Sequence, residues 1–267
     1  ISHFFPAMLV PVLTLVAILV TMLCRFYRVG APGSMFFVMA ASIAAYTPTA
    51  VTDVPLKVGL LTMGCLLATL IAFFYSLVIL RLREPQPIAP LLKADFDFVV
   101  VDAVVVGAFV GVSLALAQAL QLERPYWVPV SCLAVIQGMS LRAVWMRQLH
   151  RLLGTILGLL VAFALLMLPL GKWSVALLLT TLSFIIETAV MRHYGFAVIF
   201  ITPLTIFLAD AATLGLEPPG QVIEARLIDT VVGCAVGLVG GVCLHSTRFR
   251  AVITPLIRRA IPSRLIP

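Results

Sequence analysis

Residues 124–137 combine a cation, two aromatic rings and an amide, which together could bind a planar organic anion. Arg124 is followed by Tyr126 and Trp127, and Gln137 closes the short apolar run that they open. A guanidinium group can bind a carboxylate through two parallel hydrogen bonds, and an aromatic face can stack on a planar ligand. The same residues also suit structural roles, because tyrosine and tryptophan anchor helices at membrane interfaces and a glutamine can hold a neighbouring helix.

A basic turn follows this run and carries Arg142, Arg147 and Arg151. Arg147 and Arg151 are four residues apart, so they share one face of a helix. One interpretation is a cluster that fixes the orientation of the chain in the membrane and binds lipid headgroups. The other is a cytoplasmic vestibule whose positive potential concentrates carboxylates before export.

Four acidic residues stand about one turn inside predicted apolar helices: Asp102, Glu187, Asp210 and Asp229. An ionisable group at that depth is costly, which makes each of them a candidate for proton coupling. Arg226 lies three residues before Asp229, and this spacing predicts an ion pair between the two. Asp102 and Glu187 have no obvious partner nearby in the sequence.

Signatures of enzymes, metal sites and cofactor sites are missing from the sequence. The four histidines are isolated, the five cysteines stand singly in or beside apolar stretches, and no phosphate-binding Gly-Lys motif occurs. The sequence therefore predicts no catalytic residue, no metal and no cofactor.

The composition is that of an integral membrane protein. Of the 267 residues, 62% are hydrophobic and 11% are charged, which leaves too little polar surface to cover a water-soluble globule. The apolar runs are long and lack strand-like alternation, so they predict an all-α, polytopic membrane protein. The net charge of +7 comes from lysines and arginines in short loops, which the positive-inside rule explains without nucleic acid.

Nine membrane-spanning helices are predicted. Their ranges are 4–24, 30–45, 58–80, 98–120, 126–139, 152–170, 174–190, 195–209 and 226–244. The second, fifth and eighth are shorter than the roughly 20 residues that cross a bilayer, so they must extend into loops or be locally broken.

These helices divide into two membrane blocks. A three-helix block, 1–83, is joined by a proline-bearing cytoplasmic linker, 84–97, to a six-helix block, 98–247, and a basic cytoplasmic tail, 248–267, follows. The first three helices repeat the pattern of the last three. We interpret the chain as half of one six-helix repeat plus one complete repeat, and we expect three further helices before it.

Glycine pairs four residues apart predict places where two helices pack closely. They are Gly107 and Gly111, Gly154 and Gly158, and Gly233 and Gly237.

Two motifs, Arg124-Pro125-Tyr126-Trp127 and Arg151-x-x-Gly154-Thr155-x-x-Gly158, give the chain a family resemblance. Over roughly 98–247 it resembles the fusaric-acid-resistance and aromatic-acid-exporter family of bacterial inner-membrane proteins. The resemblance implies a proton-coupled efflux transporter for aromatic or other organic anions, with a periplasmic adaptor as partner and a homo-oligomeric assembly. The alternatives are a passive anion channel, similar to plant malate channels, and a membrane scaffold of an envelope complex that transports nothing.

Broken helices at matched positions of a repeat tend to hold the substrate of a transporter near the midplane. The short runs 30–45 and 195–209 occupy such positions. This predicts a path lined by Thr202, Pro203 and Thr205, with Thr47 and Thr49 opposite and the aromatic pair Tyr126 and Trp127 towards its outer mouth. The alternative is that proline only kinks a packed helix.

Alternating the loops places fourteen of the 18 lysines and arginines on one side of the membrane and four on the other. The positive-inside rule makes the richer side cytoplasmic, and with it the C-terminus.

This charge asymmetry predicts the outcome of cysteine labelling in intact cells. Single cysteines introduced at Gly171 and Pro218 should react with an impermeant maleimide, whereas cysteines at Arg147 and Arg258 should react only after the cells are opened. The reverse pattern would contradict the orientation.

Overall fold

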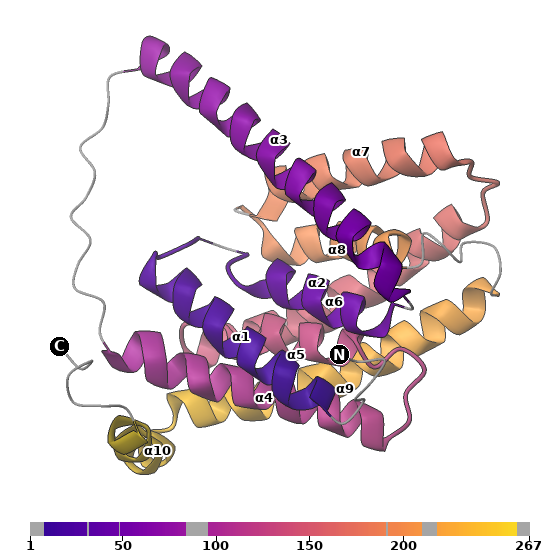
Figure 1. Ribbon diagram of the computed structural model, residues 1–267. Coiled ribbons are helices and arrows are strands. Elements are labelled where there is room, and N and C mark those ends of the chain that lie inside the picture. Colours follow the sequence, from indigo (N-terminus) through magenta and orange to yellow (C-terminus); the bar gives the residue numbers. More distant parts are fainter. Residues whose placement is uncertain are drawn as a thin grey trace. The chain divides into compact units, whose positions relative to one another are not determined.

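The computed structural model describes residues 8–30, 32–47, 49–83, 96–190, 192–209 and 218–260. All regular structure in this part of the chain is helical, with ten α-helices (Figure 1). The prediction of an all-α, polytopic membrane protein is confirmed. The helices form two compact units, Thr47–Ala94 on the one hand and Ile1–Tyr46 with Asp95–Pro267 on the other.

The larger unit holds nine of the α-helices and a short π-helical stretch, η3. In chain order they are α1 (Leu9–Phe26), α2 (Met35–Tyr46), η3 (Asp97–Val101), α4 (Asp102–Ala119), α5 (Trp127–Ile136), α6 (Leu141–Leu166), α7 (Lys172–Val190), α8 (Tyr194–Ala209), α9 (Pro219–His245) and α10 (Thr247–Ala260). The first two helices therefore share a unit with the later block. That unit boundary falls inside the predicted block 1–83.

The smaller unit consists of a 3₁₀ turn, η2 (Val51–Asp53), and the long helix α3 (Val54–Leu82). No residue of α3 is buried, although the helix is strongly apolar. Side chains of this kind are suited to lipid tails rather than to water.

Six of the described helical segments are long and apolar enough to cross a membrane, and three apolar helices are shorter. The short ones are α2, α5 and α8, which are the helices predicted to be short. With 10 residues, α5 spans only about 15 Å. All of its residues are buried, and it packs against α2, α4, α6 and α9, so this short helix is enclosed by other helices.

Glycines allow these helices to come close together. A Cβ atom on Gly237 of α9 would lie 2.6 Å from the carbonyl oxygen of Cys132 on α5. A Cβ atom on Gly158 of α6 would lie 2.6 Å from the carbonyl oxygen of Ile199 on α8. Gly111, the equivalent position on α4, faces Thr14 of α1. Each of the three glycine pairs thus lies where two backbones nearly touch.

Two helices begin seven or more residues earlier than the sequence predicted. α6 begins at Leu141 rather than residue 152, because Ser140 caps it by accepting a hydrogen bond from the backbone N–H of Ala143 at 3.2 Å. α9 begins at Pro219 rather than residue 226, since proline is well accommodated in the first turn of a helix. Arg151 and Arg226 consequently lie well inside their helices.

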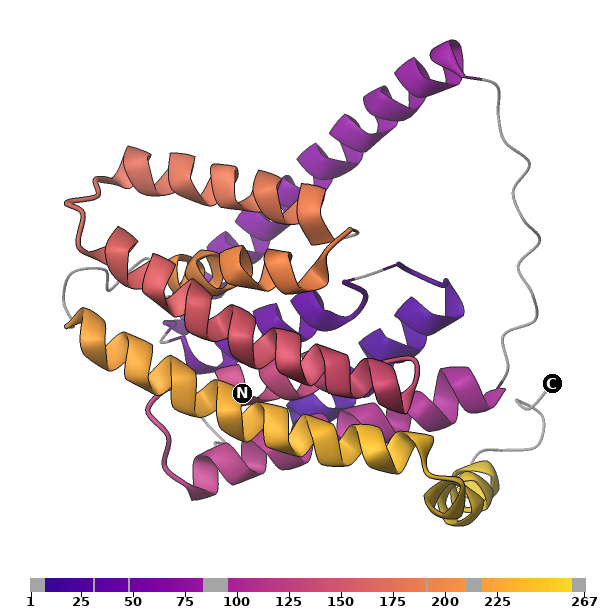
Figure 2. The same cartoon turned by 180° about the vertical axis from the view of Figure 1, so that it is seen from behind.

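The predicted basic tail is also helical in its described part. It forms α10, which turns sharply away from α9 at Ser246 (Figures 1 and 2). The helix carries Arg248, Arg250, Arg258 and Arg259.

The close contact of α9 with α5 predicts that a methyl group added at Gly237 lowers the stability of the protein. Gly237→Ala should destabilise the protein by about 1–3 kcal/mol, since the new Cβ meets backbone that cannot move aside cheaply. Thermal unfolding in detergent would measure the change. Gly64→Ala on α3 is the matched control, because nothing lies within 4 Å of its Cβ, and it should leave the protein as stable or more so. Equal melting temperatures for the two variants would contradict the prediction.

Candidate functional site

A buried polar core lies among α5, α6, α8 and α9. Its members are all at most 1% exposed: Ser131, Arg151, Thr155, Thr202, Thr205, Arg226, Asp229 and Thr230. The helices that carry them are in contact, α5 with α9, α6 with α8, and α6 with α9, and Figure 2 shows α6 and α9 side by side. Two of the eight residues are arginines, which are rarely placed so deeply in a membrane protein without a function.

Arg151 is the more exceptional of the two arginines. Its Nη2 atom lies 3.4 Å from the hydroxyl of Ser131 on α5, while its Nε and Nη1 atoms have no hydrogen-bond partner among the described residues. Gln148 Oε1 and Thr155 Oγ1, three residues before and four after it, are buried and equally unsatisfied there. One face of α6 thus presents three polar groups with unused bonding capacity.

Arg226 on α9 is 0% exposed and faces the same short helix. Its guanidinium carbon lies 3.4 Å from the centre of the Trp127 ring, and Nη2 donates to Thr205 on α8 at 3.2 Å. Trp127 and Ser131 are four residues apart on α5, roughly 6 Å along its axis. The two arginines therefore meet successive turns of one face of α5.

The predicted vestibule of three arginines is wrong for Arg151. That side chain lies in the helix core, because α6 begins ten residues before it. Arg142 is exposed, and Arg147 is half-buried with its guanidinium 5.7 Å from the centre of the Tyr194 ring on α8. The cluster is thus spread along three turns of α6, from its surface to its interior.

The aromatic pair before α5 is largely enclosed. Trp127 is 1% exposed, and Arg226 covers one face of its ring. Tyr126 packs against both Trp127 and Tyr46, and Arg124, itself buried, lies 3.4 Å from the Tyr126 hydroxyl. The structure brings Arg124, Tyr126 and Trp127 together. Arg226, however, covers a face of the Trp127 ring on which a ligand was expected to stack.

The acidic candidates are placed differently from one another. The predicted ion pair of Arg226 with Asp229 is wrong, since the described ion pairs do not join them and Asp229 Oδ2 has no hydrogen-bond partner there. Arg226 instead lies against the Trp127 ring of α5 and donates to Thr205 of α8. Glu187 is exposed on α7, and Asp210 lies outside the described residues.

The predicted path residues of α8 lie in the polar core. Thr202 contacts the Gly158 position of α6, and both threonines also bond to the backbone of their own helix. Pro203 is buried within α8. Thr47 and Thr49 belong to the smaller unit, where Lys57 donates to Thr49 at 2.6 Å.

A family model described as fusaric acid resistance protein-like matches residues 103–240, about half of the chain. The chain belongs to this family. The family resemblance drawn from the two arginine motifs is confirmed, and those motifs hold Trp127, Arg151 and Thr155 of the polar core.

Two curated relatives of this fusaric acid resistance protein-like chain carry no assigned activity. The uncharacterized membrane protein YvaC of Bacillus subtilis is 28% identical over 173 residues, which cover 64% of this chain and 27% of YvaC. The uncharacterized protein YhfK of Escherichia coli is 30% identical over 168 residues, 61% of this chain and 23% of YhfK. The match thus spans about a quarter of the length of either relative. No solved structure matches the chain significantly.

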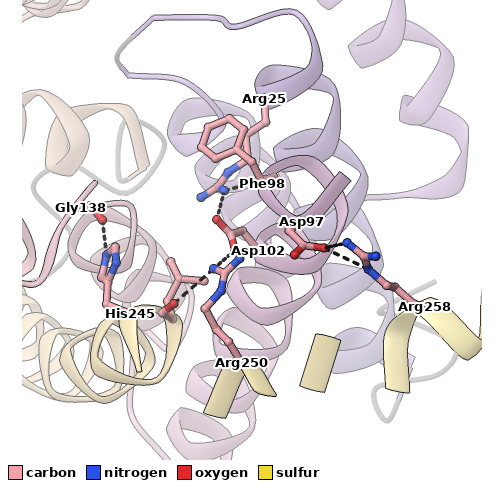
Figure 3. A network of polar contacts seen from close by, with 9 residues as sticks. Arg25, Asp97, Phe98, Asp102, Gly138, His245, Arg250 and Arg258 are labelled. Carbon is pink, nitrogen blue, oxygen red and sulfur yellow. Dashed lines mark hydrogen bonds and ion pairs between the residues drawn. The ribbon is translucent and has the colours of Figure 1, made fainter. Parts of the chain in front are cut away.

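A second polar cluster of this family member joins α1, α4, α9 and α10 (Figure 3). Asp102 accepts hydrogen bonds from Arg25 at 2.7 Å and from Arg250 at 2.6 Å. Arg25 also donates to the carbonyl oxygen of Phe98 at 2.7 Å. Asp102 was expected to have no partner nearby in the sequence, and both partners do come from distant parts of the chain, 77 and 148 residues away. Beside it, Asp97 pairs with Arg258 at 2.8 Å.

Gln137 also serves a helix contact. Its amide donates to the hydroxyl of Ser34 at 2.6 Å, and Ser34 in turn accepts from Thr21 on α1 at 3.1 Å. This chain of bonds ties the end of α5 to α1 and to the turn before α2.

Sequence reasoning missed Ser131, Gln148, Arg226 and Thr230 as site residues. Arg226 was seen only as the partner of Asp229, and Thr230 as part of an apolar run. A signal was available in the spacing of Arg226, Thr230, Gly233 and Gly237, which recurs every three or four residues and marks one helix face.

The Asp102 cluster predicts a stability effect. Asp102→Asn removes the shared partner of Arg25 and Arg250, whose side chains are 13% and 34% exposed, and should cost about 3 kcal/mol of unfolding free energy. Asp97→Asn, the control, removes the partner of Arg258, which is 47% exposed, and should cost at most about 1 kcal/mol. Denaturant unfolding in detergent would separate them, and equal losses would contradict the assignment.

Proposed function

We propose that this chain is part of an inner-membrane transporter that exports aromatic or other organic anions, and that it is not an enzyme. The observation that carries the proposal is Arg151. Its guanidinium group is 1% exposed in the helix core, and two of its nitrogen atoms lack a hydrogen-bond partner among the described residues.

A buried guanidinium needs an anion more than any other group does. Arginine does not lose its proton in proteins, so it cannot become neutral when it is buried. An uncompensated charge in the interior costs several kcal/mol, and an anionic ligand would remove that cost. Gln148 and Thr155 stand on the same face of α6 and would add an amide and a hydroxyl to the same ligand.

The second arginine supports a path rather than a single site. Arg226 lies one turn further along α5, with Trp127 and Thr205 as its contacts. Five hydroxyl groups are buried among these helices: Ser131, Thr155, Thr202, Thr205 and Thr230. Several modest binding positions in series suit transport, because a ligand must be held strongly enough to enter and weakly enough to leave.

The substrate class and the partners rest on the family. Its description names resistance to fusaric acid, an aromatic acid, and the aromatic side chains Tyr126 and Trp127 beside the path suit a planar anion. Coupling to protons stays a prediction for Glu187, Asp210 and Asp229. Asp102 is better suited to a structural role, because it pairs with two arginines. The periplasmic adaptor, the homo-oligomer and the cytoplasmic C-terminus are parts of the same proposal.

Transport of radiolabelled benzoate in proteoliposomes tests the proposal. Arg151→Gln should lower the initial rate about tenfold or more, since a hydrogen bond to a charged group contributes about 1.5–3 kcal/mol. Arg151→Lys keeps the charge and should retain more of the rate than the glutamine variant. A rate that follows an imposed pH gradient is expected for an exporter, and an uncoupled current would indicate a channel.

Arg248→Gln is the matched control, because this arginine is exposed on α10 and the charge change is the same. It should transport at the rate of the parent protein. Equal rates for Arg151→Gln and Arg248→Gln, with both proteins folded, would contradict the proposed path.

A further inference from the structure

A cavity of about 220 Å³ lies between the loop after α4 and the first turns of α9. These two segments lie at the end of the larger unit that is opposite α10 (Figure 1). It is lined by Gln121, Leu122, Glu123, Gln221, Glu224, Ala225, Ile228 and Asp229. The residues from α9 recur every three or four positions, so they form one face of that helix. This face is next to the one that carries Arg226 and Thr230.

The charged side chains among the described lining of this outer cavity are all carboxylates. Asp229 is 1% exposed, and its Oδ2 atom has no hydrogen-bond partner among the described residues. Glu123, on the loop after α4, and Glu224, on α9, are exposed lining residues of the cavity, as are Gln121 and Gln221. None of the described residues that line the cavity is a lysine or an arginine. The cavity therefore offers three carboxylates to a ligand.

Two arginines stand next to these carboxylates in the sequence, and both interact electrostatically with Asp229 while they also contact other side chains. Arg124 lies 3.4 Å from the Tyr126 hydroxyl, and Arg226 lies on the Trp127 ring and donates to Thr205. The formal charges of Glu123, Glu224, Asp229 and these two arginines sum to −3 + 2 = −1. A ligand with one positive charge would neutralise the group.

We propose that this cavity binds the ammonium group of a small organic amine. The ammonium N–H groups would donate to Asp229 Oδ2, and the carbon chain would lie against Leu122, Ala225 and Ile228. Glu123 and Glu224 attract the cation to the mouth of the cavity. Asp229 belongs both to this cavity and to the polar core, whereas the other residues that line the cavity are not part of the core. Amine binding is measured without transport, so a failure of this site is distinguishable from a failure of the proposed anion path.

An amine fits this cavity better than a metal ion does. No group of three acidic, histidine or cysteine side chains close enough to hold a metal occurs among the described residues. Three of the lining residues are aliphatic, which suits a hydrocarbon chain and not an ion. The volume is below the roughly 300 Å³ at which pockets for drug-sized ligands begin, so the amine is a small one.

Calorimetric titration of the purified full chain in detergent with n-butylammonium chloride tests the site. The parent protein should bind this probe, and sodium and magnesium chloride should give no comparable binding. Asp229→Asn should weaken binding about tenfold or more, as the loss of a charged hydrogen bond implies. The double variant Glu123→Gln with Glu224→Gln should weaken it about two- to fivefold, because these carboxylates are exposed and screened.

Asp53→Asn, at an exposed carboxylate of the smaller unit that is not among the described residues lining the cavity, is the matched control and should bind like the parent. If Asp229→Asn does not fold, the exposed double variant decides the outcome. Absence of amine binding, or binding that neither Asp229→Asn nor the double variant changes, would overturn the site. Equal binding of sodium or magnesium with the same dependence on Asp229 would overturn the assignment to amines.

Discussion

The contact between α9 and α5 is the constraint on which the polar core depends. A helix of 10 residues cannot cross a bilayer, so α5 has to be enclosed by other helices. Glycines on α9 allow its backbone to approach the carbonyl oxygens of α5 so closely that no side chain would fit between them. That approach sets Trp127 against Arg226, and α6, which packs on the same helix, sets Ser131 against Arg151.

The arginines of this protein meet two contrasting environments. At the α10 end, Arg25 and Arg250 share the carboxylate of Asp102, which neutralises part of their charge and ties three helices together. In the core, Arg151 has one hydroxyl contact at 3.4 Å and no carboxylate partner among the described residues. Removing one partner of a buried ion pair destabilises a fold, whereas a buried cation that lacks a counter-ion favours the binding of an anion. This contrast separates the structural cluster from the candidate site.

Helix boundaries decided which sequence predictions succeeded. Hydropathy placed the apolar runs well, but it began α6 and α9 too late, because the arginines and glutamates of their first turns lower the local average. Arg151 was consequently expected in a loop and Arg226 at a helix end, where it would pair with Asp229. Capping by Ser140 and the proline at the start of α9 extend both helices and bury these arginines.

The sequence by itself determined the membrane class, the all-helical fold, the three short helices and the family, because these follow from composition, periodicity and local motifs. It also located the glycine pairs, since close helix packing needs small residues at a spacing of four. Only the tertiary structure decided which helix each glycine faces, which arginine pairs with Asp102, and that Asp229 borders a cavity. Those outcomes depend on contacts such as Arg250 with Asp102, between residues 148 positions apart, which no local pattern encodes.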